Sequence, residues 1–105
     1  MEKRLDQLIR DRQLSDASTT VRRYLRDSKT PNPLAWRQLA VIQERLDDKA
    51  GSHESLAKYF ESIDELGRAA GQLELALREV APDSQDKLRL DASLRDLYDK
   101  ASRNR

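Results

Sequence analysis

Apolar residues recur every three or four positions along nearly the whole chain, which is the spacing of one face of an α-helix. Leu66, Ala69, Leu73 and Ala76 form the strongest stretch of this pattern. No segment alternates apolar and polar residues with the two-residue period of a β-strand. The sequence therefore predicts an all-α fold.

Breaks in this periodicity predict about six helices. Pro31 and Pro33 separate two helical patterns, because proline lacks an amide donor and fits only the first turn of a helix. Asn32, Asp64 and Ser84 are expected to cap helices, since their side-chain oxygens can accept from the free amides at a helix start. The helices are expected over about residues 2–13, 16–28, 33–46, 53–63, 65–80 and 84–101.

The first two of these helices are inferred from two separate apolar stripes. Leu5, Leu8 and Ile9 form the first stripe, and a second begins after residue 16. Ser15 or Asp16 can cap the second helix. We therefore expect a break between the two helices at about these residues.

Charges nearly cancel in this chain, since 20 Lys and Arg oppose 19 Asp and Glu for a formal net charge of +1. A binder of nucleic acid normally carries a one-sided basic field, so no nucleic-acid partner is expected. No apolar run approaches the roughly 20 residues that cross a bilayer, so we expect no membrane span and no targeting signal. The length of 105 residues predicts one domain over residues 1–105, and the absence of cysteine excludes disulfides and thiol chemistry.

The predicted helices follow one another at about 17 residues, half of the 34-residue period of tetratricopeptide repeats. Trp36, Leu39 and Ala40 fit the start of such a repeat, and the segment 53–60 fits it again one helix later. Antiparallel helix pairs stacked as a short, degenerate tetratricopeptide-like superhelix are therefore expected. A generic helical bundle with the same Leu and Ala periodicity is the alternative.

Four segments carry a narrower resemblance: residues 34–40 (Leu-Ala-Trp-Arg-Gln-Leu-Ala), 53–60 (His-Glu-Ser-Leu-Ala-Lys-Tyr-Phe), 71–78 (Gly-Gln-Leu-Glu-Leu-Ala-Leu-Arg) and 90–97 (Leu-Asp-Ala-Ser-Leu-Arg-Asp-Leu). In order and helix spacing they resemble the C-terminal tail of bacterial zinc metalloproteases, among them the beta-barrel assembly-enhancing protease family of the periplasm. The resemblance covers about residues 16–103.

This resemblance implies a protein-interaction module, the non-catalytic tail of a periplasmic zinc metalloprotease, that docks the enzyme to protein substrates or to outer-membrane assembly machinery. One alternative is a structural lid or spacer that regulates its own peptidase domain, and another is a generic helical adaptor. The expected partner is accordingly a peptide segment, an assembly component or the peptidase domain, and the expected state is a monomer or weak dimer.

No catalytic or cofactor site is expected in this chain. A zinc peptidase needs His-Glu-x-x-His, in which two imidazoles one helical turn apart hold the metal. His53 and Glu54 begin this pattern, but Ala57 replaces the second ligand and His53 is the only histidine. His53 is predicted to be a partly buried helix residue, and the chain itself is not predicted to be an enzyme.

Candidate protein-binding residues follow from the phase of the helices. If Trp36 marks the buried side, the opposite side of the same helix faces a groove, and the next helix continues it. The candidates share this predicted exposure and mixed charge: Arg37, Val41, Glu44, Arg45, Glu54, Lys58 and Glu61.

Overall fold

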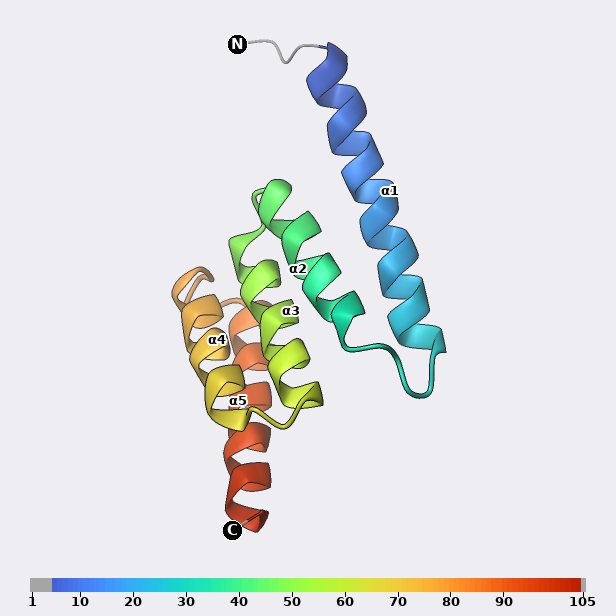
Figure 1. Cartoon of the computed structure of the whole chain (residues 1–105). Helices are drawn as coiled ribbons and strands as arrows, with labels where there is room; N and C mark the ends of the chain where they lie inside the picture. The colour runs from blue at the N-terminus through green and yellow to red at the C-terminus, as the bar shows by residue number, and fades with distance from the viewer. Residues whose placement is uncertain (1–4, 105) are drawn as a thin grey trace.

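Five helices make up the described part of the chain, residues 5–104, in a computed structural model. They are α1 (Leu5–Asp27), α2 (Leu34–Arg45), α3 (Lys49–Ser62), α4 (Leu66–Arg78) and α5 (Gln85–Arg103). Each helix packs antiparallel against the next, as Figure 1 shows. No strand occurs among these residues, so the all-α prediction is confirmed there.

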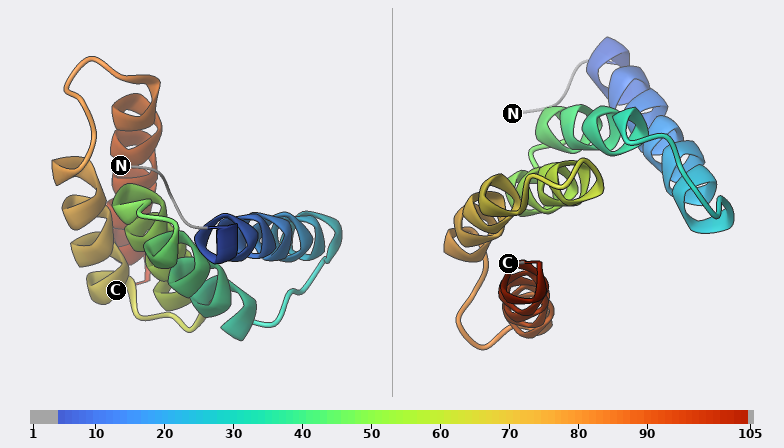
Figure 2. Two further views of the ribbon diagram at one scale, coloured as in Figure 1. Left: turned by 90° about the horizontal axis from the view of Figure 1, so that it is seen from above. Right: turned by 60° about the horizontal axis from the view of Figure 1, so that its bottom comes forward.

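The bundle is elongated, with extents of 53 × 33 × 19 Å. The first turns of α1 project beyond the end of α2 (Figure 1). At the other end of the chain α5 lies beside both α4 and α3 (Figure 2). Ion pairs from α5 to Glu54 and Glu61 of α3 hold it there.

The predicted break between the first two helices is wrong, because α1 runs without interruption through Ser15 and Asp16. No glycine or proline lies within α1 to end it. Thr19 and Thr20 instead donate their hydroxyls to the carbonyls of Ser15 and Asp16, at 3.1 and 3.0 Å, as hydroxyl side chains do inside helices. Five helices therefore replace the six expected.

The start of α2 agrees with its prediction. The Asn32 side chain accepts from the amide of Leu34 at 3.0 Å, and Pro33 already has helical dihedral angles. Ser84 likewise caps α5 by accepting from the amide of Lys87. These caps could be anticipated because they use only neighbours in the sequence.

Two turns of identical design separate α2, α3 and α4. Asp47 and Asp64, 17 residues apart, both have φ of 63°. The residue after each donates its amide to a carbonyl five positions earlier, at 2.8 Å in both turns, which is the bond that closes a Schellman motif. Asp64 is therefore a helix-ending residue, and its predicted capping role is wrong because Glu65 occupies the N-cap position. Asp48 caps α3, which begins about four residues earlier than expected.

Replacing Asp47 or Asp64 by glycine should stabilise the protein. Glycine adopts positive φ without the steric cost that an L side chain has there, so each change should raise the free energy of unfolding by about 0.5 kcal/mol. Urea unfolding followed by circular dichroism measures this. Asp48→Ala is the control and should lower the free energy of unfolding by about 1 kcal/mol, because it removes the side-chain cap of α3. A loss of stability in Asp47→Gly would contradict the assigned turn.

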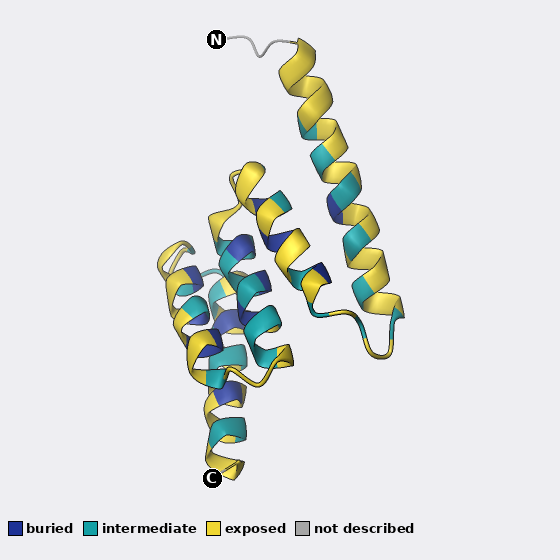
Figure 3. Ribbon diagram, in the orientation of Figure 1, coloured by how far each residue is buried: buried dark blue, intermediate teal, exposed yellow. Residues whose placement is uncertain are grey.

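The largest core cluster lies where α3, α4 and α5 meet, and Figure 3 shows the buried residues gathered there. Ala57, Ala69 and Ala76 are almost fully buried, as expected of small residues that let helices approach closely. Leu90 and Leu97 of α5 fill the space beside them.

The two glycines of α4 have no such packing role. Gly67 and Gly71 are exposed, and a Cβ at either position would meet nothing within 4 Å.

Candidate functional site

An apolar groove runs between α1 and α2, and we call it the α1/α2 groove. Its volume is about 520 Å³. Leu34 and Val41 of α2 form much of its floor, although their side chains are 52% and 49% exposed. The residues that line it are Val21, Leu34, Arg37, Gln38, Val41 and Ile42. Apolar side chains left half-exposed side by side can contact a partner without a change of fold.

A second hollow adjoins the groove at the start of α2, and we call it the Tyr24 hollow. It has a volume of about 370 Å³ and shares Val21, Leu34 and Gln38 with the groove. Thr20, Tyr24, Asn32 and Ala35 complete its lining. The Tyr24 hydroxyl accepts from the amide of Asn32 at 2.8 Å, which fixes the loop between α1 and α2.

Arg37 and Val41 are the predicted α2 residues that line the groove. The Arg37 guanidinium lies over the ring of Tyr59 of α3, 5.3 Å from its centroid, which holds the charge at the groove rim through a cation–π contact. Glu44 and Arg45 are exposed on the same helix but do not line the groove.

The predicted α3 residues face α5 instead. Glu54 accepts two bonds from Arg89, at 2.9 and 3.0 Å, and the same guanidinium donates to Asp86 at 2.7 Å. These hydrogen bonds raise the pKa of Arg89, the bond to Glu54 contributing most. Glu54 is therefore committed to holding α5 in place.

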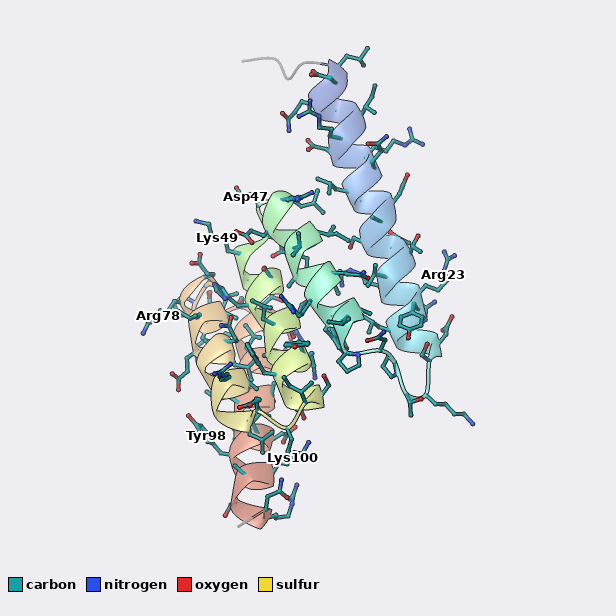
Figure 4. The ribbon with its side chains drawn as sticks, viewed as in Figure 1. Arg23, Asp47, Lys49, Arg78, Tyr98 and Lys100 are labelled. Carbon is teal, nitrogen blue, oxygen red and sulfur yellow. The ribbon has the colours of Figure 1, made fainter. Side chains whose placement is uncertain are left out.

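Glu61 and Lys58 border a small space of about 80 Å³ between α3 and α5. Glu61 lies 3.8 Å from the ammonium of Lys100, whose side chain Figure 4 places on α5 beside α3. Asp96 and Ser93 complete the polar part of this lining.

The structure thus divides the predicted site residues between two places. Arg37 and Val41 line the α1/α2 groove, whereas Lys58 and Glu61 line the α3/α5 space. Sequence reasoning did not select Val21 and Leu34 as binding residues, although both line the groove. Leu34 could have been found, because a leucine directly after Pro33 stands seven residues before Val41 and hence on the same helix face.

His53 is half-buried, as expected, and its Nδ1 lies 2.8 Å from the side-chain amide oxygen Oε1 of Gln72. The contact joins α3 to α4 and gives His53 a structural partner. Within residues 5–104 no group of three or more His, Cys, Asp or Glu side chains could hold a metal ion. Over the same range, no helix has the length and apolar character to span a bilayer.

Comparisons of the chain with protein-family models, with curated proteins and with solved structures gave no match. The geometry of the site consequently carries the functional argument. An apolar floor with one guanidinium and one amide at its rim is suited to holding a protein segment by apolar contact and a few hydrogen bonds.

Proposed function

We propose that this chain is a protein-interaction module with tetratricopeptide-like stacking, the non-catalytic tail of a periplasmic zinc metalloprotease. It docks the enzyme to its protein substrates or to outer-membrane assembly machinery. The observation that carries the proposal is the exposed apolar groove between α1 and α2, with Arg37 fixed at its rim. Sequential antiparallel helices and the turn repeated after 17 residues support the repeat-like stacking.

The groove defines the chemistry of its partner. Leu34 and Val41 can bury apolar side chains of a bound segment, and Arg37 can donate to a carboxylate or carbonyl beside them. Completing the burial of a half-exposed Leu or Val contributes about 1 kcal/mol. A few such contacts fall well short of the roughly 8 kcal/mol of a micromolar complex once the entropy of association opposes them, so docking through this groove alone is expected to be weak and reversible.

Val41→Asp should weaken partner binding at least about tenfold, since it places a charge on the apolar floor of the groove. An isotope-labelled NMR titration of the full chain with a barrel-assembly component measures the dissociation constant. Leu88→Asp is the matched control, because Leu88 is an exposed leucine of α5 outside the groove.

Equal weakening by the two variants, or none by Val41→Asp, would contradict the groove as the docking site. A parallel titration uses the peptidase domain of the parent enzyme. Chemical-shift changes with that domain alone would show that the chain is a structural lid for its own peptidase domain. They would contradict docking to an external protein.

A further inference from the structure

The α1/α2 groove and the Tyr24 hollow form one continuous surface. They share Val21, Leu34 and Gln38, so a bound segment can contact both at once. Leu34 and Val41 stand seven residues apart on α2, which is about two helical turns, or about 10 Å along the helix axis. A bound segment can therefore cover both residues with two apolar side chains about 10 Å apart.

Arg37 is the only charged residue among the described residues that line either hollow. It follows Leu34 by three residues and precedes Val41 by four, so it lies between them on the exposed side of α2. Within residues 5–104 no carboxylate forms an ion pair with Arg37, and no acceptor takes a hydrogen bond from its guanidinium. The groove thus has a positive charge without a counterion next to its apolar floor.

Tyr59 holds this guanidinium in place. Helix α2 lies between α1 and α3 (Figure 1), and the Arg37 side chain contacts the Tyr59 ring on the α3 side. The contact involves no oxygen acceptor, so the N–H donors remain available to a carboxylate, which can accept two of them side by side. Because the side chain is already held, it loses less rotamer freedom on binding than a mobile arginine would.

The other charges near the groove do not oppose this one. Glu44 and Arg45 follow Val41 on α2, but they are exposed, do not line the groove and are neighbours of opposite sign. Thr20 and Tyr24, the α1 residues that line the Tyr24 hollow together with Val21, are uncharged. Arg37 therefore determines which charge a partner must carry at the groove.

We infer that the α1/α2 groove selects protein segments in which an Asp or Glu lies between two apolar side chains. The apolar side chains cover Leu34 and Val41, and the carboxylate accepts from Arg37 between them. A lysine or arginine in the same place would bring like charges together, so basic segments with the same apolar pattern are rejected. The inference rests on the proposed function, because it specifies the partner of the same groove.

Selection from a random peptide library displayed on phage, with the immobilised full chain as the target, tests the inference. The bound peptides should be enriched severalfold, relative to the unselected library, in Asp or Glu between two aliphatic or aromatic residues. Arg37→Glu should reverse this preference in favour of Lys or Arg. Arg95→Glu is the matched control, because it makes the same charge change at an exposed position of α5 outside the groove. It should leave the preference for Asp and Glu unchanged.

Leu34→Ser in the same selection distinguishes this inference from the proposed function, because it makes the groove floor polar without changing its charge. Peptides that Leu34→Ser no longer enriches, but that show no preference for Asp or Glu, would overturn the inference and leave the groove as the docking site. A preference for Asp or Glu that persists in Arg37→Glu would also overturn it. Peptides enriched equally by the original chain and Leu34→Ser, or no enrichment by the original chain, would contradict docking in the groove and the inference with it.

A charge exchange measures the contact with Arg37 directly. The dissociation constant of the most enriched peptide is measured by isotope-labelled NMR titration of the full chain. Arg37→Glu should raise it at least about fivefold, and so should replacement of the acidic residue of the peptide by lysine. The two changes together should restore the dissociation constant to within about threefold. Arg37 is exposed, so unchanged circular dichroism is expected in Arg37→Glu. Effects that multiply when the two changes are combined would show that Arg37 and the carboxylate do not interact, and would overturn the inference.

Discussion

Leu90→Ala is expected to lower the free energy of unfolding by about 2–5 kcal/mol, the range for deleting a large side chain from a packed core. Leu90 is 1% exposed and is the largest fully buried side chain among residues 5–104. It belongs to the cluster in which α5 packs against Ala57 of α3 and Leu73 of α4. Alanine in its place leaves a cavity at the point where three helices meet, and small rigid neighbours cannot move to fill it.

Urea unfolding of the full chain, followed at 222 nm by circular dichroism, measures this loss. A domain of this size has a total stability of about 5–15 kcal/mol, so the midpoint should fall by a large fraction of its value. Leu88→Ala, two residues earlier on α5 and 65% exposed, should change stability by less than about 0.5 kcal/mol. Equal effects from the two leucines would contradict the packed face assigned to α5.

The features that depend on near neighbours could be predicted from the sequence. Asn32 and Ser84 set helix starts by accepting from amides two or three residues away, and Pro33 supplies helical dihedral angles at the start of α2. The buried alanines were also expected, because they recur at helical spacing beside larger apolar residues. By contrast, the predicted cap of α4 at Asp64 is one position too early, and the predicted start of α3 is about four residues too late, since the acidic residues in each turn look alike until one adopts positive φ.

The continuity of α1 could not be predicted from its pattern. Its apolar stripe changes sides between Ile9 and Leu14, and in a sequence such a change looks like the boundary of two helices. The helix persists because residues with moderate helix propensity, such as Ser15 and Asp16, cost too little to end it. The change of side leaves Leu5, Leu8 and Ile9 exposed, whereas Leu14 is half-buried.

The candidate site was predicted in part. Phasing from Trp36 placed Arg37 and Val41 on an open face, and both line the α1/α2 groove. The other wall of that groove is Val21, and its approach to α2 depends on how α1 crosses α2. The partner of Glu54, Arg89, is likewise 35 residues away in the sequence. Contacts of this kind follow from tertiary packing and leave no local signal.

A buried amide joins the first three helices. Gln43 of α2 is 5% exposed, and its side-chain amide lies against the hydroxyl of Ser55 of α3. Ser55 is itself only 4% exposed. With the amide turned so that its oxygen meets a donor, Gln43 accepts from Arg22 of α1 at 3.0 Å and donates to the carbonyl of Gly51 at 2.9 Å. Gly51 must be small here, because a Cβ would come within 2.7 Å of the same amide.

Gln43→Leu should lower the free energy of unfolding by about 1–3 kcal/mol, the cost of leaving buried polar groups without their partners. Leucine keeps most of the buried volume, so the loss reports the bonds to Arg22 and Ser55 more than a cavity. Gln38→Leu is the matched control on the same helix. Gln38 is exposed and should change stability by less than about 0.5 kcal/mol when replaced.

Combining Ser55→Ala with Gln43→Leu distinguishes the contribution of hydrogen bonding to stability from the contribution of side-chain packing. Ser55→Ala alone removes a partner of the buried amide and should cost about 1–2 kcal/mol. In the double variant both polar groups are gone, so the combined loss should fall short of the sum of the single losses by about 1 kcal/mol or more. Additive losses measured by urea unfolding would mean that the two side chains stabilise the protein independently. A coupled pair would show that this amide, standing between α1 and α3, fixes how the first helix is set on the bundle, and with it the width of the α1/α2 groove.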